Sequence, residues 1–184
     1  MYVGSLQLLE IIALEDRLNS SEGLKLPIRV LVADGHYLSA KVIERYFINN
    51  ESINIVGIAA EGSEIRRMMG ESPIDILLLD LTIPEFDGLQ VISFVRSVFP
   101  RVKIIVYSMI NDSDTIHKAF DLGAVGYITK DAEYDKVAEA IMFAHQVGKF
   151  LCRQAIQSVD NGKYYNLFMT SVQKKDKPVS PMNN

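Results

Sequence analysis

The feature that most constrains this chain is a regular alternation of apolar runs, rich in valine and isoleucine, with segments of helical periodicity. The apolar runs are Ile28–Ala33, Ile53–Ala59, Ile74–Leu79, Val102–Tyr107 and Val125–Ile128. The helical segments are Leu38–Ile48, Ser63–Met69, Leu89–Val98, Ser113–Leu122 and Tyr134–Val147. Strands that are apolar on both faces and alternate with helices form parallel sheets that are covered on both sides. We therefore predict an α/β domain with a doubly wound, five-stranded parallel sheet over residues 28–150.

The segments on either side of this domain have weaker patterns. Residues 1–27 are predicted to be an N-terminal helical extension, either packed or frayed on the domain or available to bind a partner. Residues 151–172 have the pattern of one more helical, linker-like segment. Residues 173–184 carry lysines and prolines without apolar periodicity, and we expect a disordered tail there.

Composition excludes several classes of protein. A formal net charge of −4 gives no basic footprint, so direct binding to nucleic acid is not expected. The single cysteine, Cys152, excludes an internal disulfide and suits a reducing compartment. Because the chain has neither a bilayer-length apolar run nor a secretory leader, we expect a cytoplasmic protein without membrane contact. The three histidines, His36, His117 and His145, lack the spacing of a zinc site, so surface or packing roles are expected for them.

Chemistry-bearing side chains follow the predicted strands. The first strand leads to Asp34, the third to Asp80, the fourth to Ser108 and the fifth to Lys130. The carboxyl ends of parallel strands share one edge of a sheet, where ligands bind. A carboxylate there can accept a phosphoryl group as an aspartyl phosphate. Mg²⁺, a lysine ammonium and a serine hydroxyl would offset the negative charge of the incoming group. Each residue alone also fits a plain role as a helix cap, a turn residue or a solvated charge.

Three stretches of this sequence resemble response-regulator receiver domains. They are the phosphoacceptor segment Asp75–Gly88, the lysine-bearing fifth strand Gly123–Ala132, and the first strand with its acidic end, Ile28–His36. The first-strand stretch is especially similar to receivers of the LuxR-type (NarL/FixJ-like) two-component regulators, and the resemblance covers roughly residues 28–150. It implies the flavodoxin-like receiver fold.

The resemblance also implies a role for each matching residue. Asp80 becomes the phosphoacceptor, and Asp34 becomes part of an acidic Mg²⁺ pocket to which Thr82 adds its backbone carbonyl. Ser108 becomes the switch hydroxyl, Tyr127 the switch aromatic and Lys130 the phosphate-binding lysine. For Tyr127, ordinary packing in a strand beside a glycine is an equally good interpretation.

Two positions depart from the family pattern. The family usually has two adjacent acids after its first strand, and here the second is Gly35. Loss of a carboxylate about 4 Å from a divalent ion removes several kcal/mol of attraction at an effective dielectric constant of about 20, partly offset by lost repulsion. We therefore expect weakened Mg²⁺ binding and slower phosphorylation, although the glycine could leave room for water in the ligand's place. Met109 follows the switch hydroxyl where a small residue is common, and it could narrow access to Asp80 or point into the core.

The resulting prediction is a non-enzymatic signalling switch that a histidine kinase phosphorylates on Asp80, in the setting of transcriptional control. Its output surface, which could form a homodimer, would combine the helix over residues 113–122, the strand over 125–128 and the helix over 134–147. The residues after 150 lack the pattern of a helix-turn-helix domain. The alternative is a pseudo-receiver that binds its partners independently of phosphate. An enzyme on a similar sheet is disfavoured, because the first βα turn is not glycine-rich and Thr82 stands where a phosphatase needs a second acid.

Overall fold

The computed structural model describes residues 26–146 and 150–151. The predicted extension over residues 1–27 lies outside the described residues apart from its last two positions, and so do the segment 151–172 after its first residue and the tail 173–184. No described helix is long and apolar enough to cross a membrane.

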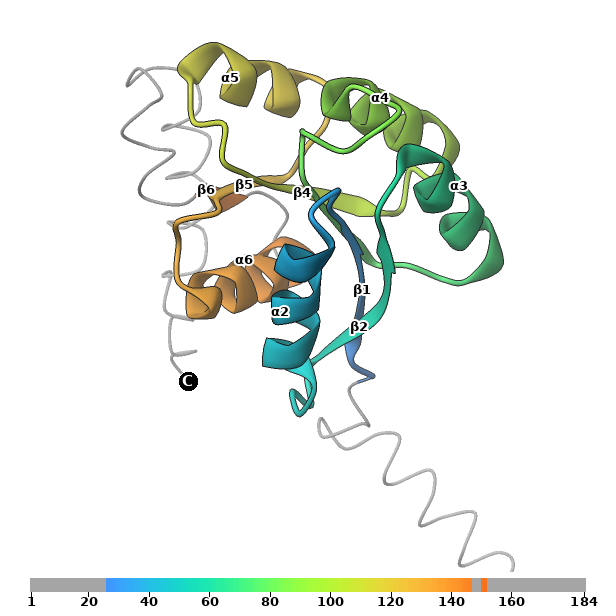
Figure 1. Ribbon diagram of the computed structural model, residues 1–184, viewed down its shortest axis with the longest axis vertical. Helices are drawn as coiled ribbons and strands as arrows, with labels where there is room; N and C mark the ends of the chain where they lie inside the picture. Colours follow the sequence, from blue (N-terminus) through green and yellow to red (C-terminus); the bar gives the residue numbers. More distant parts are fainter. Residues whose placement is uncertain (1–25, 147–149, 152–184) are drawn as a thin grey trace, which may run out of the picture.

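The described chain forms one parallel sheet whose strands alternate with helices (Figure 1). The strands are β1 (Ile28–Ala33), β2 (Ile53–Ala59), β3 (Ile76–Leu79), β4 (Lys103–Ser108), β5 (Gly126–Thr129) and β6 (Phe150–Leu151). The helices are α2 (Tyr37–Phe47), α3 (Gly62–Glu71), α4 (Gly88–Val98), α5 (Ser113–Asp121) and α6 (Tyr134–Gln146). The strand order is β2-β1-β3-β4-β5-β6, so the chain winds outward from β1 in both directions.

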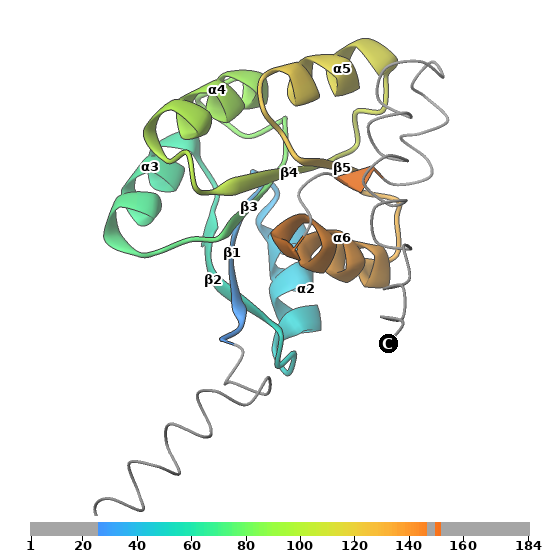
Figure 2. The same ribbon diagram turned by 180° about the vertical axis from the view of Figure 1, so that it is seen from behind.

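Helices cover both faces of the sheet. Helices α2 and α6 lie on one face, and α3, α4 and α5 lie on the other (Figures 1 and 2). Every residue of β3 and β5 is buried, as expected for strands between two helical layers. The side chains alternate between the layers: Leu77 and Leu79 join the core under α3–α5, whereas Ile76 and Leu78 join the core under α2 and α6. The predicted doubly wound sheet and its five strands are therefore confirmed.

The structure differs from the sequence prediction in small respects. A sixth strand, β6, pairs in parallel with β5, with Gly126 opposite Phe150 and Tyr127 opposite Leu151. Two residues are too short for any periodicity to predict. Strand β3 begins at Ile76 rather than Ile74, and the Asp75 carboxylate accepts a hydrogen bond from the backbone N–H of Arg29 (2.9 Å). The predicted boundaries of β1 and β2 match the observed ones.

Candidate functional site

The buried polar residues of the described chain gather at the carboxyl edge of the sheet. They are Asp34, Asp80, Ser108 and Thr129, which stand at or directly after the ends of β1, β3, β4 and β5. Parallel strands bring these positions together, because all of their carboxyl ends meet at one edge. Burial of polar groups is unfavourable unless they are paired, so the hydrogen bonds at this edge decide what it can do.

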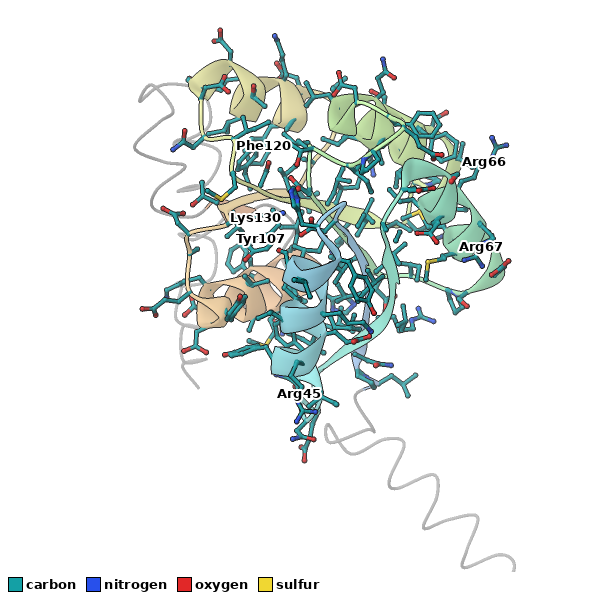
Figure 3. The ribbon with its side chains drawn as sticks, viewed as in Figure 1. Arg45, Arg66, Arg67, Tyr107, Phe120 and Lys130 are labelled. Atoms are coloured by element: carbon teal, nitrogen blue, oxygen red, sulfur yellow. The ribbon has the colours of Figure 1, made fainter. Side chains whose placement is uncertain are left out.

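Lys130 joins the two carboxylates. Its Nζ donates to Oδ2 of Asp34 and to Oδ2 of Asp80, at 2.8 Å in each case. The side chain of Lys130 is only 10% exposed, and both carboxylates are 2% exposed. Nζ also lies 5.9 Å from the centre of the Tyr107 ring, and the two residues are labelled next to each other in Figure 3. Burial raises the pKa of Tyr107 to about 12, with help from nearby Tyr134, Asp34 and Asp131, so its phenol stays neutral.

Asp80 also accepts hydrogen bonds from two hydroxyl groups and a backbone N–H. The hydroxyl of Ser108 donates to its Oδ1 at 2.9 Å, and the hydroxyl of Thr82 donates to its Oδ2 at 2.7 Å. The backbone N–H of Thr82 also donates to Oδ1, at 3.2 Å. Burial raises the pKa of the Asp80 carboxyl, but the hydrogen bonds from Lys130 and Thr82 outweigh it and leave the pKa below its ordinary value. Asp80 is therefore a carboxylate at neutral pH.

The turn after β3 is held by its own local contacts. The side chain of Asp87 accepts a hydrogen bond from the N–H of Leu89 and caps the N-terminus of α4. At Gly88 a Cβ atom would lie 2.4 Å from the Cα of Leu81, so only glycine allows the turn to close this tightly. These contacts fix the loop that carries Thr82 beside Asp80.

A second side of the pocket lies at the end of β1. Ligand atoms of Asp34, His36 and Asp80 lie within 4.8 Å of one another, a spacing that suits a metal ion. A Cβ at Gly35 would lie 2.5 Å from Cδ of Pro84, so the Pro84 ring occupies the space above the glycine. The expectation that water stands in the ligand's place stays a prediction, because this contact concerns only the position next to the Gly35 backbone.

The donor set fits a divalent cation. Two buried carboxylates face one ammonium group, which leaves one excess negative formal charge in the pocket. The carbonyl oxygen of Thr82 lies 3.6 Å from the point where a Cβ of Gly35 would be, on the wall of the same pocket. Carboxylates together with a backbone carbonyl are the ligands that Mg²⁺ and Mn²⁺ accept.

Two further predicted positions lie next to this pocket. Tyr127 is fully buried in β5, and its hydroxyl donates to the carbonyl oxygen of Ile110 at 2.7 Å. Met109 is 70% exposed, so of the two orientations expected for its side chain, the one into the core is wrong. His36, which was expected in a surface or packing role, is 75% exposed at its side chain, and its backbone N–H donates to Asp34 Oδ1 at 2.9 Å. This turn holds His36 next to the acidic pocket.

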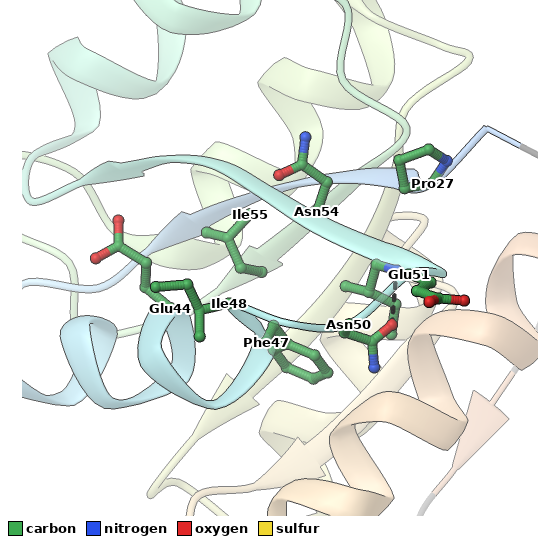
Figure 4. Close-up of a pocket in the computed structure, with 9 residues that line it drawn as sticks. Pro27, Glu44, Phe47, Ile48, Asn50, Glu51, Asn54 and Ile55 are labelled. Atoms are coloured by element: carbon green, nitrogen blue, oxygen red, sulfur yellow. Dashed lines mark hydrogen bonds between the residues drawn. The ribbon is translucent and has the colours of Figure 1, made fainter.

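A separate cavity of about 460 Å³ opens at the amino ends of β1 and β2 (Figure 4). Phe47 and Ile48 at the end of α2 form one wall, and Asn50 closes the turn by accepting hydrogen bonds from the N–H groups of Ser52 and Ile53 (2.9 Å each). None of the predicted site residues lines this cavity. The predicted site residues lie at the opposite edge of the sheet, away from this cavity.

Comparison with known proteins agrees with this geometry. Residues 30–142 match the family model of the response regulator receiver domain. The chain belongs to the response-regulator receiver family. Members of this family act as switches set by phosphoryl transfer, generally bind Mg²⁺ through acidic residues, interact with histidine kinases and are generally not enzymes.

Individual relatives are regulators of transcription by name. The chain is 33% identical over 111 residues to the uncharacterized transcriptional regulatory protein YhcZ of Bacillus subtilis, covering 60% of this chain and 52% of YhcZ. It is 29% identical over 115 residues to the probable transcriptional regulatory protein NarL of Mycobacterium tuberculosis, covering 62% of this chain and 53% of NarL. The chain thus spans about half the length of these curated relatives.

Solved structures agree on the fold. A LuxR-family response regulator from Aurantimonas sp. superposes with a TM-score of 0.68 at 25% identity, covering 72% of this chain and 95% of that one. The signal receiver domain of the putative response regulator NarL from M. tuberculosis superposes with a TM-score of 0.62 at 28% identity, covering 65% and 97%. The predicted likeness to LuxR-type receivers is confirmed.

Proposed function

We propose that Asp80 accepts the phosphoryl group and that this event switches the protein. The observation that carries the proposal is the position of Asp80: a buried carboxylate at the end of β3, bound by Lys130, Ser108 and Thr82. An oxygen of Asp80 attacks the phosphorus of a phosphohistidine on a kinase. The new P–O bond forms as the P–N bond breaks, and the electron pair of that bond stays with the imidazole nitrogen. The other ring nitrogen carries a proton, so the histidine leaves as a neutral imidazole.

The neighbouring groups prepare Asp80 for this step. The ammonium of Lys130 offsets the charge of the incoming phosphoryl oxygens, and its contact with Asp34 fixes its position. The hydroxyl of Ser108 is a hydrogen-bond donor that can turn from the carboxylate to a phosphoryl oxygen. Asp34, Asp80 and the Thr82 carbonyl would hold Mg²⁺, which supplies charge neutralisation between the carboxylate and the phosphoryl group when it is bound. Gly35 contributes no carboxylate, so Mg²⁺ affinity is weakened.

Ser108 and Tyr127 would carry the signal away from the site. A rotation of Ser108 toward the phosphoryl group would move the segment that includes Ile110. The carbonyl oxygen of Ile110 accepts the hydrogen bond of the Tyr127 hydroxyl, so Tyr127 would move with it. The output surface is then formed by α5, β5 and α6, where a second copy or another partner would bind. Because β5 is buried and strand β6 pairs with its Gly126 and Tyr127, most of the exposed part of this surface belongs to the helices α5 and α6.

The family supports a proposal for the cellular role of this chain. We propose that a histidine kinase is the phosphodonor, that the switch acts in transcriptional control in the cytoplasm, and that the chain has no other catalytic activity. The regulatory names of the relatives at 29–33% identity support this.

The mass of the intact protein tests the proposal. The chain is incubated with acetyl phosphate and Mg²⁺ beside a control receiver, and one added phosphoryl group is expected. The Asp80→Asn variant should gain none. An unmodified wild-type chain, at every Mg²⁺ concentration that labels the control, would overturn the proposal.

A second candidate function rests on the altered end of β1. Residue 35 is a glycine, so the pocket lacks the second acid of the family, and the Pro84 ring lies against that position. Both features favour a module that binds partners independently of phosphate. In that case Asp80→Asn would leave partner binding unchanged. Loss of partner binding in that variant would exclude this function.

A further inference from the structure

We propose that His36 is a metal ligand in the acidic pocket and that this pocket therefore prefers ions that accept nitrogen, such as Mn²⁺, over Mg²⁺. The inference rests on the acidic pocket of the proposed function, and it deepens that function by naming the ion. It combines three features: the position of the imidazole, the space filled by Pro84 and the side from which Lys130 approaches.

The imidazole of His36 already lies at the pocket. Its Nδ1 is 3.6 Å from Oδ1 of Asp34, and these two residues share with Asp80 a set of ligand atoms within 4.8 Å of one another. Donor atoms bound to one ion at about 2.1 Å lie roughly 3–4 Å apart, so the set needs only a small contraction. His36 is 75% exposed at its side chain, which leaves the ring room to turn while Asp34 and Asp80 stay in place.

The oxygen ligand that His36 would replace has no room. A side chain at residue 35 meets the Pro84 ring, with Cδ 2.5 Å and Cγ 3.1 Å from the position of its Cβ. His36 is the next residue, and its N–H is tied to Asp34 Oδ1. The turn therefore presents an imidazole where an acid is missing.

Lys130 leaves this side of the pocket open. Its ammonium contacts Oδ2 of Asp34 and Oδ2 of Asp80, whereas the histidine faces Oδ1 of Asp34. An ion beside His36 would therefore use a different oxygen of Asp34 from the one that Lys130 holds. Metal binding and the lysine contact can coexist.

The change of ligand alters the choice of metal. Mg²⁺ is a hard ion that prefers oxygen and keeps its waters, so an imidazole adds little to its affinity. Mn²⁺ and the later divalent ions of its row accept imidazole nitrogen, with affinities that rise along the series to copper. Replacement of a carboxylate by an imidazole also removes one negative charge, which weakens Mg²⁺ without removing a ligand for Mn²⁺.

Calorimetric titration of the full chain with MnCl₂ and with MgCl₂ at one fixed pH tests the inference. The variant is His36→Gln, and the matched control is His145→Gln, which changes an exposed imidazole at the far end of α6. We expect His36→Gln to weaken Mn²⁺ by about tenfold or more and Mg²⁺ by less than about twofold. His145→Gln should change neither. An equal effect of His36→Gln on both ions, or none on Mn²⁺, would overturn the inference.

Pulsed electron paramagnetic resonance of bound Mn²⁺ detects a nitrogen ligand directly, and a loss of protein stability in the variant would not produce or remove that signal. Modulation from a directly bound ¹⁴N nucleus is expected in the wild type and in His145→Gln, and it should vanish in His36→Gln. A wild-type spectrum without nitrogen modulation would contradict the inference. The phosphorylation assay separates the two claims: nitrogen ligation without labelling of Asp80 refutes only the proposed function, and labelling without nitrogen ligation refutes only the role of His36.

Discussion

The two edges of the sheet differ in how their charged side chains are paired. At the amino edge, Arg29 donates two hydrogen bonds to Asp75, Nε to Oδ2 at 2.9 Å and Nη2 to Oδ1 at 2.7 Å. Lys103 there donates to the carbonyl oxygens of Ala144 and His145 at the end of α6, at 2.8 Å each. At the carboxyl edge, two carboxylates share the single ammonium of Lys130.

The difference separates stability from function. A matched ion pair and a cation on helix carbonyls both favour the folded state. A pocket with one carboxylate in excess is costly to bury, and the cost falls only when a cation or a phosphoryl-bound ion complex arrives. The charged contacts of the amino edge therefore contribute to the stability of the fold, whereas those of the carboxyl edge suit the binding of a ligand.

The largest expected effect comes from removal of the shared ammonium. Lys130→Met should slow phosphorylation by acetyl phosphate by about 100-fold or more, because the incoming phosphoryl oxygens lose their buried cation. The matched control is Lys136→Met on α6, which removes an exposed lysine paired with Glu139. The intact mass, followed over time, gives the phosphorylation rate of each variant. Equal rates in the two variants would contradict the proposed role of the buried Lys130.

Restoring the missing acid should strengthen Mg²⁺ binding. Gly35→Asp combined with Pro84→Ala is expected to raise Mg²⁺ affinity by about tenfold, because the carboxylate gains the space of the proline ring. Gly35→Asp alone should gain less. The control is Gly70→Asp on α3, where a Cβ would meet no atom of the described residues within 4 Å. Calorimetric titration measures each affinity, and a full gain in the single variant would show that Pro84 is not the obstacle.

At the amino edge the same kind of change should cost stability. Asp75→Asn is expected to lower the free energy of unfolding by about 1 kcal/mol, a value reduced because Arg29 is 41% exposed. Asp34→Asn leaves Asp80 and Lys130 as a matched pair, so it should leave stability unchanged or raise it. Urea denaturation of both variants measures this difference, and a larger loss for Asp34→Asn would reverse the roles of the two edges.

The Asp75 pair also predicts a dependence on pH. Hydrogen bonds from Arg29 hold the pKa of Asp75 below its ordinary value in the folded state. Its stabilisation is therefore present above the unfolded pKa of about 3.9 and is lost as the pH falls through the lower folded value. The wild-type advantage over Asp75→Asn should shrink as denaturation is repeated from pH 5 toward pH 2. An advantage that grows in acid would contradict the assignment.

A last effect on stability, of opposite sign, concerns Thr129 at the end of β5. Its buried hydroxyl has no hydrogen-bond partner among residues 26–146 and 150–151, and this unpaired group lowers the stability of the folded state. Thr129→Val keeps the shape and should raise the free energy of unfolding by about 1 kcal/mol. Thr115→Val, which removes a hydroxyl that interacts with Asp112, should lower it instead. Equal shifts of the midpoint in both variants would refute this account of Thr129.

The sequence was sufficient to predict the sheet and most of the pocket. Asp34, Asp80, Ser108 and Lys130 could be placed together because strand ends meet at one edge whatever the details of packing. The roles drawn for them from the family remain predictions until Asp80 is labelled.

Other features could not be predicted because they depend on contacts between distant segments. The Pro84 ring lies over Gly35 because the loop after β3 reaches the end of β1, and no periodicity encodes that approach. The spacing of the three histidines indicates surface or packing roles, and it carries no information about how near His36 lies to Asp34. The signal in the sequence for this proximity is the position of His36 two residues after Asp34, because the turn brings the imidazole ring back beside the carboxylate.

Site mapping of the aspartyl phosphate tests the central claim most directly. The chain is treated with acetyl phosphate and Mg²⁺, reduced with borohydride to convert the aspartyl phosphate to homoserine, and analysed by peptide mass spectrometry. One strand separates the two candidate acids, Asp75 at the amino edge and Asp80 at the carboxyl edge. The account predicts homoserine at residue 80 and none at residue 75. Homoserine at 75, or at neither residue while a control receiver is converted, would contradict it.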